Sequence, residues 1–249
     1  MAESLPLIKP VWPAPASVQA IATTRQGGVS QGAWASFNLG QHCGDQADHV
    51  AINHQRLAAQ LPAAPHWLRQ VHGTRVIHLD DWSPGIEADG AWTDRPDVVV
   101  AILTADCLPV LLADRQGSLV AGLHAGWRGL AGGILSAGVA ALPITPDRLV
   151  AWLGPAISAA AYEVDDPVRE AFVSQHVEWS KYFPVNARGR YQADLKGLAR
   201  EQLAAAGVAD IVDSDLCTAG QPERFFSWRR DGGRTGRQAS LIWRRDKRA

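Results

Sequence analysis

The segment DVVVAILTADCLPVLLAD, residues 97–114, contains two apolar runs on either side of a short polar junction. Continuous runs of Val, Ile, Leu and Ala predict strands that are buried on both faces. Two such strands are usually joined through Gly, Asn or Ser. This junction instead carries an acid, Asp106, a thiol, Cys107, and a proline, Pro109. The segment therefore raises the question of why an ionisable pair lies at the rim of a core.

Further strands and helices alternate along the rest of the chain. Apolar runs predict strands at 119–125, 147–157 and 208–215, two short strands in 66–79 that are broken at Gly73, and a strand pair at 224–232 and 237–245. Helical spacing predicts a helix at 46–61 capped by Asp45, one at 126–142, one at 165–176 capped by Asp166, and one at 193–207 capped by Asp194.

The order of these elements predicts the fold class. Strands and helices are interleaved, but several neighbouring strands have the spacing of hairpins. This combination favours a mixed sheet with layered helices, α/β or α+β, over a purely parallel sheet. Because no linker or repeat divides the chain, a single domain is expected over residues 1–249.

Composition and charge are those of an ordinary globular protein. The 249 residues are 47% apolar and 20% charged with a net charge of −1, so no basic excess indicates a nucleic-acid partner. No apolar stretch reaches the roughly 18 residues of a membrane-spanning helix, and no signal peptide is evident at the N-terminus. The cysteines, Cys43, Cys107 and Cys217, are odd in number and far apart, which favours a reducing cytoplasm.

Three residues with sulfur or imidazole donors follow short apolar strands. His72 in QVHG and His124 in LHAGWRG each precede a glycine turn, and Cys107 follows the first apolar run. One thiolate and two imidazoles form a donor set suited to zinc, with a fourth position open as in catalytic sites. Two other interpretations remain: separate core residues, or a nucleophile, Cys107, with His124 as its base.

Two arginines and one asparagine are candidates for contacts to an anion or a substrate. Arg25 lies in a glycine-rich loop, and Arg128 lies in the first turn of the helix predicted after His124, where backbone N–H groups favour anions. Asn38, in SFNLG, is a candidate donor to a ligand. Each has a plainer alternative, because such arginines often extend into water and such asparagines often bond their own backbone.

Nine segments of the sequence together resemble a known family. They are TTRQGGVS, FNLGQHCGD, WLRQVHG, ADG, TADCLPVLLAD, HAGWRGLAGG, WLGPAI, YEV and FFSWRRDGGRTGR. The resemblance runs from about Ala22 to Trp243 and is to the laccase-domain family, also called the polyphenol oxidase or purine nucleoside phosphorylase family, which includes bacterial YfiH-like proteins. The sequence departs from the family pattern at Trp34, Phe37 and Trp228, which are pocket-wall and loop positions.

This resemblance implies a fold, a metal site and an activity. The implied fold has layered helices around mixed sheets and is similar to the catalytic domain of a bacterial cytotoxin. The implied metal ligands are His72, Cys107 and His124, with zinc as the metal and copper as the alternative. The implied reactions are phosphorolysis of adenosine, inosine, guanosine and methylthioadenosine, and deamination of adenosine. The partners would be purine nucleosides and phosphate, and the chain would be a monomer or a homodimer.

Under this interpretation Asp106 and Arg128 are the candidate catalytic residues, and Arg25 and Asn38 are the candidate substrate contacts. Asp106 would shuttle protons at the metal, with the alternative that its carboxylate only bonds loop amides. Two rival functions are a Cys–His hydrolase acting on cell-wall precursors and a copper polyphenol oxidase. The oxidase is disfavoured because the chain has no H-x-H pair of the kind that multicopper centres commonly use.

Overall fold

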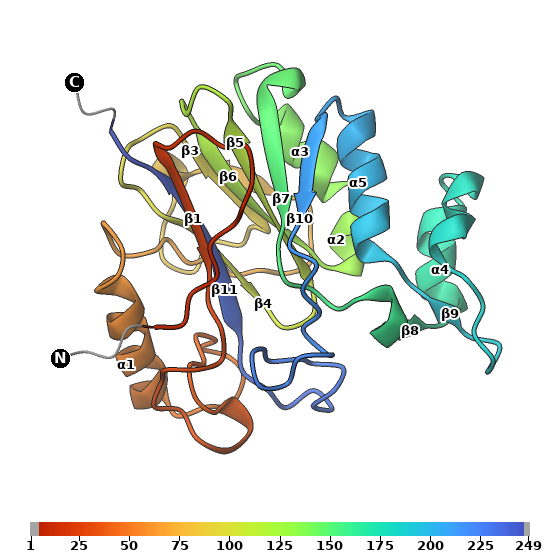
Figure 1. Ribbon diagram of the computed structural model, residues 1–249, viewed down its shortest axis with the longest axis horizontal. Coiled ribbons are helices and arrows are strands. Elements are labelled where there is room, and N and C mark those ends of the chain that lie inside the picture. Colours follow the sequence, from red (N-terminus) through yellow and green to blue (C-terminus); the bar gives the residue numbers. More distant parts are fainter. Residues whose placement is uncertain (1–4, 247–249) are drawn as a thin grey trace.

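Two β-sheets lie face to face at the centre of the structure, a computed structural model that describes residues 5–246 (Figure 1). The strands are β1 Val18–Ala22, β2 Val76–His78, β3 Gly90–Thr93, β4 Val100–Thr104, β5 Leu108–Asp114, β6 Val120–Ala125, β7 Leu149–Leu153, β8 Glu163–Val164, β9 Tyr191–Gln192, β10 Asp210–Asp213 and β11 Gln238–Arg244. The larger sheet has the order β10-β7-β5-β6-β3-β2, and the smaller has the order β1-β11-β4. A short ribbon of β8 and β9 lies apart from both.

Helices cover the outer faces of both sheets (Figure 1). They are α1 Ala47–Ala58, α2 Trp127–Ala131, α3 Ile134–Ala140 and α5 Leu195–Ala205, whereas α4 Asp166–Val173 packs against α2 at the side of the molecule, near β9. Residues of α2, α3 and α5 share a core with the larger sheet, and α1 packs on the smaller one. The resulting layers, helix, sheet, sheet and helix, confirm the predicted mixed α/β class with helices around mixed sheets.

The two apolar runs of segment 97–114 form β4 and β5, and each strand is buried on both faces. In β5, Val110 points to the helices and Leu111 points to the smaller sheet. In β4, Ile102 faces the larger sheet and Ala101 faces α1. Burial on both faces is the reason that these runs are continuous, because a half-exposed strand would alternate apolar and polar residues.

Although β4 and β5 are consecutive in the sequence, they do not pair with each other. β4 pairs with β11 in the smaller sheet, whereas β5 lies between β6 and β7 in the larger one. The junction 105–107 therefore carries the chain from one layer to the other. Asp106 adopts φ 88° in this crossing, a left-handed conformation that is uncommon outside glycine.

The predicted helices differ from the observed ones in length and in their caps. The helix expected over 126–142 is divided into α2 and α3, because Gly133 adopts φ 90° between them. Asp194 caps α5 as expected and accepts a hydrogen bond from the first turn. The observed N-caps of α1 and α4 are the neighbours of Asp45 and Asp166 rather than these residues themselves.

The strand prediction was wrong at two places. Residues 224–232 form turns that place Phe225 and Phe226 in the interior, so β11 pairs with β1 and β4 instead of with this segment. The strand expected before Gly73 is reduced to isolated bridges. In both segments the apolar residues are buried although the backbone forms loops. Their composition therefore resembles that of a buried strand.

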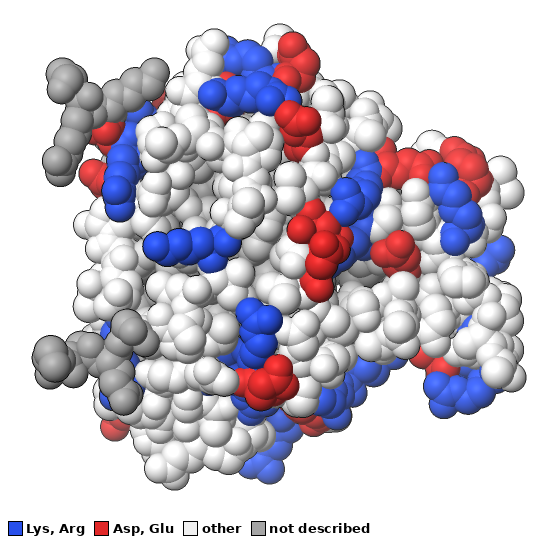
Figure 2. All heavy atoms as spheres, viewed as in Figure 1, with Lys and Arg blue, Asp and Glu red and all other residues white. Residues whose placement is uncertain are grey.

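Three general predictions concern the surface and the extent of the chain. Within residues 5–246, no helix is both long and apolar enough to cross a bilayer. On the face shown in Figure 2, basic and acidic residues both occur, and basic residues gather along its lower edge. The single domain expected over 1–249 includes residues 1–4 and 247–249, which lie outside the described residues.

Candidate metal centre and active-site pocket

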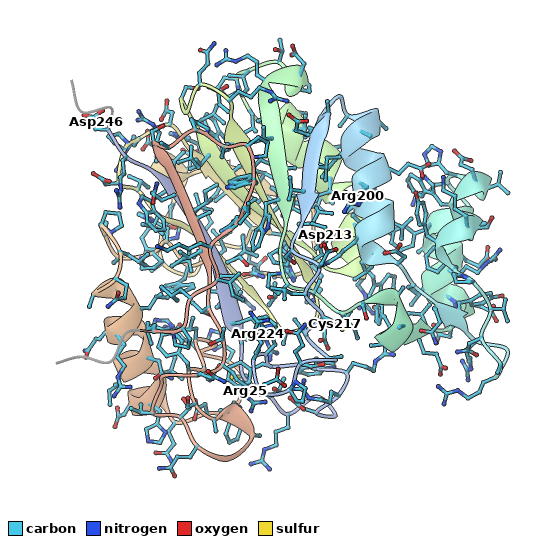
Figure 3. All side chains as sticks on the ribbon, viewed as in Figure 1. Arg25, Arg200, Asp213, Cys217, Arg224 and Asp246 are labelled. Carbon is cyan, nitrogen blue, oxygen red and sulfur yellow. The ribbon has the colours of Figure 1, made fainter. Side chains whose placement is uncertain are left out.

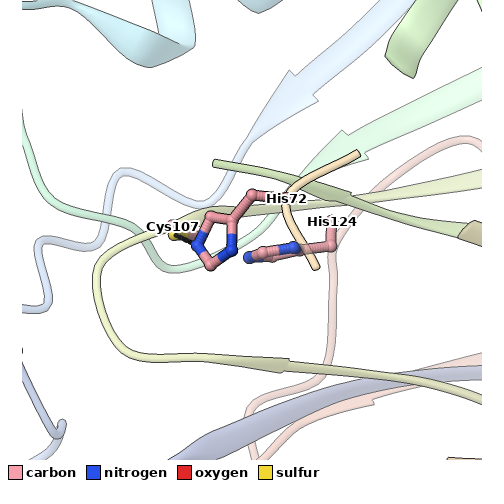
Figure 4. Close-up of side chains that lie close together, drawn as sticks. All are labelled: His72, Cys107 and His124. Atoms are coloured by element: carbon pink, nitrogen blue, oxygen red, sulfur yellow. Dashed lines mark hydrogen bonds between the residues drawn. The ribbon is translucent and has the colours of Figure 1, made fainter. Parts of the chain in front are cut away.

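His72, Cys107 and His124 converge at one end of the larger sheet (Figure 4). Their donor atoms all lie within 4.8 Å of one another. Cys107 Sγ is 3.8 Å from His72 Nε2, and the two imidazole rings meet edge to face with their centroids 4.8 Å apart. The structure thus brings together the three side chains expected from the sequence, in a group that could hold a metal ion.

Strand pairing and one glycine set the positions of these side chains. Cys107 immediately precedes β5, and His124 lies in β6 opposite Pro109. Gly126 follows β6, and a Cβ atom there would lie 2.7 Å from His72 Cδ2 and 3.1 Å from Cys107 Sγ. A side chain at this position would therefore push the two donors apart, and glycine is required for their close approach.

A buried carboxylate, Asp89, fixes the two histidines relative to each other. One oxygen accepts hydrogen bonds from His124 Nδ1 at 2.8 Å and from the His72 N–H at 2.9 Å. The other accepts from the N–H groups of Gly73 at 2.7 Å and Val71 at 3.2 Å. These bonds hold the turn in which His72 adopts φ 62°, a conformation that costs free energy for a residue other than glycine.

The donor set and its support fit a zinc ion. Because Nδ1 of His124 donates to Asp89, Nε2 is free to bind a metal, and a carboxylate is a usual partner of a metal-binding imidazole. A thiolate with two imidazoles matches catalytic zinc sites, in which three protein ligands leave one position open. Sequence patterns alone do not single out Asp89, whose only signal is the segment ADG, 88–90, at the start of β3.

The charges around Cys107 favour a deprotonated sulfur. Burial alone would raise the pKa of this thiol, but the positive charge of His124 and hydrogen bonds from His124 and His72 lower the pKa to about 6. Burial would lower the pKa of His124, but the Cys107 thiolate and Asp89 raise it to about 9. The shift of the Cys107 pKa favours the thiolate, which is the form that binds metals.

The three side chains lie in the wall of a pocket of about 570 Å³. This volume is in the usual range for a site that encloses a small molecule. Apolar, aromatic and basic residues share the wall with the metal-binding group. The aromatic and basic members include Trp127, Tyr162, Trp228, Arg128, Arg229 and Arg237.

Asp106 neighbours Cys107, but its carboxylate binds the loop that precedes β11. One oxygen accepts from Thr218 Oγ1 at 2.6 Å, and the other accepts from Ser227 Oγ at 3.0 Å and the Arg229 N–H at 2.7 Å. A carboxylate with three donors is poorly placed to carry protons for a substrate. These contacts support the alternative that Asp106 holds the loop, and they do not support the predicted proton shuttle.

Arg25 does not line the pocket, contrary to the expectation that it contacts the substrate. Its guanidinium donates to the carbonyl oxygens of Ala35 at 2.8 Å and Pro222 at 3.0 Å, and it lies over the ring of Phe226. Figure 3 shows Arg25 close to Arg224, to whose carbonyl its own N–H donates. Arg25 therefore joins two loops, and its role is structural.

Asn38 is also absent from the pocket wall, and its side chain is completely buried. Its amide nitrogen donates to the carboxylate of Asp45 at 2.9 Å, and its amide oxygen accepts from the N–H groups of Gly40 and Arg237. These bonds satisfy the side chain within the protein. The expected contact to a substrate is therefore replaced by the alternative, in which Asn38 bonds nearby backbone.

Arg128 lines the pocket, and its guanidinium lies 4.3 Å from the ring centroid of Trp127. No acidic side chain of residues 5–246 forms an ion pair with it. Arg128 is therefore an exposed cation in the wall of the pocket that also contains the metal-binding group.

The chain is similar over nearly its whole length to a described protein family. The family described as multi-copper polyphenol oxidoreductase laccase matches residues 19–245. A Pseudomonas aeruginosa protein named purine nucleoside phosphorylase is 48% identical over 240 residues, which cover 96% of this chain and 98% of the relative. Purine nucleoside phosphorylase YfiH of Escherichia coli K12 is 47% identical over 240 residues, which cover 95% and 98%.

Solved structures share the fold. A Neisseria meningitidis protein of family DUF152 has a TM-score of 0.92 at 45% identity, with 96% of this chain and 99% of that chain covered. YlmD from Geobacillus stearothermophilus has a TM-score of 0.83 at 34% identity, with 93% of each chain covered. These similarities confirm both the predicted fold and the resemblance drawn from the sequence.

Replacement of a metal ligand should remove the bound metal. Because each side chain supplies one of only three protein ligands, His124→Ala and Cys107→Ala should each lose nearly all zinc, measured by elemental analysis of the purified protein. Cys217→Ala removes a thiol outside this group and should keep the wild-type zinc content. Wild-type zinc in both ligand variants would exclude the site.

Asp89→Asn should weaken zinc binding while the fold persists. The amide keeps the size of the carboxylate but places an NH₂ group against backbone donors, so affinity should fall about 10–100-fold, the usual effect of losing such a supporting carboxylate. Competition with a chromophoric chelator measures this. The control is Asp114→Asn, another fully buried acid that bonds Ser118 and Arg148 away from the pocket. Equal zinc affinity in both variants would contradict a special role of Asp89.

Asp106→Asn should lower stability without removing zinc. The substitution leaves a donor where Thr218, Ser227 or Arg229 needs an acceptor, so the free energy of unfolding should fall by about 1–3 kcal/mol. Urea unfolding measures the stability, and elemental analysis measures the zinc. Thr218→Val removes one partner of the same bond, so the double variant should lose less than the sum of the two. Unchanged stability of Asp106→Asn would show that the carboxylate does not anchor the loop.

Proposed function

Given that the chain belongs to the multi-copper polyphenol oxidoreductase laccase family, we propose that it is a zinc-dependent purine nucleoside phosphorylase. The observation that carries this proposal is the group of His72, Cys107 and His124 in the wall of a pocket that also presents Arg128. The names of the relatives supply the reaction class. The proposed substrates are phosphate with adenosine, inosine, guanosine or methylthioadenosine.

Phosphorolysis sets specific demands on the pocket. An oxygen of phosphate attacks C1′ of the sugar while the bond from C1′ to the purine nitrogen breaks, and the electron pair leaves with the purine, which takes up a proton. The pocket must therefore hold an anion close to C1′ and exclude water. The guanidinium of Arg128 carries a positive charge and can donate two parallel hydrogen bonds to the phosphate. The apolar and aromatic parts of the wall suit the purine and the sugar.

The metal-binding group would hold a zinc ion in the wall of the same pocket. Zinc, when bound, supplies a Lewis acid that stabilises negative charge on a substrate and lowers the pKa of water. The chain holds the donors for it: Asp89 orients His124 and the His72 turn, and Gly126 leaves space between His72 and Cys107. We propose deamination of adenosine, in which water adds at C6 and ammonia leaves, as a second activity of this pocket.

Zinc is the proposed metal although the family description names copper. A multicopper oxidase needs several copper centres, whereas residues 5–246 contain one group of three side chains arranged to bind a metal. A borderline-soft set of one thiolate and two imidazoles suits a single zinc ion, and copper is the alternative metal for the same donors.

We further propose a cytoplasmic protein of one domain, either a monomer or a homodimer, with small molecules as partners. The cysteines Cys43, Cys107 and Cys217 are free, which supports a reducing compartment. The net charge of −1 supports a partner other than a nucleic acid.

One set of contacts favours a second candidate function, a Cys–His hydrolase acting on cell-wall precursors. Asp89 accepts from His124 Nδ1, and the donor atoms of His124 and Cys107 lie within 4.8 Å of each other, so the three residues have the order of orienting acid, base and nucleophile. Such an enzyme attacks a carbonyl carbon with the thiolate and needs no metal. The two candidates therefore differ in their response to chelation.

Purine release from a panel of nucleosides, measured on protein of known zinc content, tests both candidates. A zinc-dependent phosphorylase should release purine and a sugar phosphate only when phosphate is present. It should lose activity on chelation and regain it when zinc is restored. A thiol hydrolase should release no purine and should keep its amidase activity after chelation. Purine release that does not depend on phosphate would contradict the phosphorylase.

A further inference from the structure

We propose that Tyr162 and Arg229, together with Arg128, form the part of the pocket that binds phosphate, so that one hydroxyl and two guanidiniums hold a phosphate dianion beside the metal-binding group. This assignment rests on the proposed function for its reaction, but the binding of phosphate can be tested without it. Neither Tyr162 nor Arg229 is a candidate on sequence patterns alone.

Tyr162 presents a hydroxyl without a protein partner to the pocket. Its ring packs against the core beneath the helices, and its backbone N–H and carbonyl bond Ala159 and Ala193. No hydrogen bond within residues 5–246 involves this hydroxyl, whereas the hydroxyl of Tyr182 donates to Glu201. The Tyr162 hydroxyl is therefore a rigidly held donor whose partner must be a ligand or water.

Arg229 is fixed over the ring of Tyr162 by three contacts. Its guanidinium carbon lies 4.9 Å from the ring centroid. Its Nη1 donates to the carbonyl oxygen of Glu163, and its backbone N–H donates to Asp106 at 2.7 Å. No carboxylate of residues 5–246 forms an ion pair with it. The side chain is exposed, and its contacts with Tyr162 and Glu163 orient the guanidinium.

The Tyr162 hydroxyl stays protonated at neutral pH, and charges of both signs act on it. Burial raises the pKa of Tyr162 to about 12, the negative charges of Cys107 and Asp106 add to this rise, and the charges of Arg229 and Arg128 oppose it. Both guanidiniums therefore act on the same small region of the pocket, where the hydroxyl remains a donor at neutral pH. Forked cations with a neutral donor match the acceptor oxygens of a phosphate dianion.

The other groups of a nucleoside substrate fit this region less well. The sugar and the purine are uncharged, so they cannot form charge-paired hydrogen bonds with the guanidiniums of Arg128 and Arg229. The apolar wall formed by Leu103, Ile157 and Leu195 offers them a better surface. Phosphate is the one substrate of the proposed reaction whose charge compensates Arg128 and Arg229.

Titration of inorganic phosphate into the zinc-loaded full-length chain by calorimetry tests the assignment. Tyr162→Phe keeps the ring and its stacking but removes the donor, and Arg229→Lys keeps the charge but removes the fork. Each should raise the Kd for phosphate about tenfold, the usual effect of losing one hydrogen bond to a charged group. In turnover, the KM for phosphate should rise while the KM for the nucleoside stays near the wild-type value.

A matched pair elsewhere in the chain provides the control. Arg169 lies over the ring of Tyr191 at 5.1 Å, in the same type of stack, and neither residue lines the pocket. Tyr191→Phe and Arg169→Lys should therefore bind phosphate as the wild type does.

The results distinguish a failure of the phosphate site from a failure of the proposed phosphorylase function. Wild-type phosphate affinity in both Tyr162→Phe and Arg229→Lys overturns the site, as does a wild-type protein that binds no phosphate at millimolar concentrations. Phosphate binding that is weakened in these variants, in a protein that performs no phosphorolysis, supports the site and overturns the proposed reaction.

Discussion

The crossing of the chain from one sheet to the other between β4 and β5 is the constraint on which the site depends. Both strands are buried on both faces, so the polar residues of this segment can lie only at the rim where the layers separate. The crossing takes place between Thr104 and Leu108. Because apolar strands hold the backbone on each side, Cys107 has a fixed position, and β5–β6 pairing places His124 next to it.

Two buried carboxylates, those of Asp89 and Asp106, each join two of the segments that form the pocket. Asp89 joins the His72 turn to His124, and Asp106 joins the crossing to the loop before β11. A buried carboxylate is stable only when donors replace its lost water, and these two have four and three donors respectively. Both carboxylates are already hydrogen-bonded to groups of the protein. The groups available to a substrate or a metal are therefore the sulfur, the imidazoles and the unpaired donors of the pocket.

The features that could be predicted from the sequence have local signals. The apolar runs of β4, β5, β6 and β7 identify buried strands, and Cys107 and His124 lie near the ends of two of them, whereas His72 lies in a turn outside any strand. The partners of Asp106 are 112 and 121 positions away at Thr218 and Ser227, so no local pattern reveals that its carboxylate is already occupied. The structure also gives Arg25 a partner far away in the sequence, Pro222, whereas the bonds of Asn38 to Gly40 are local, as the plainer alternative had it.

The position of β11 affects how the protein is made. This strand is the middle one of the smaller sheet, yet it follows every other strand in the sequence. A growing chain on the ribosome therefore contains β1 and β4 as unpaired edges until β11 emerges, and exposed edges favour aggregation. The loop that binds Asp106 is also synthesised late. The smaller sheet can consequently close only after β11 has been synthesised, and a chain that lacks β11 leaves the edges of β1 and β4 unpaired.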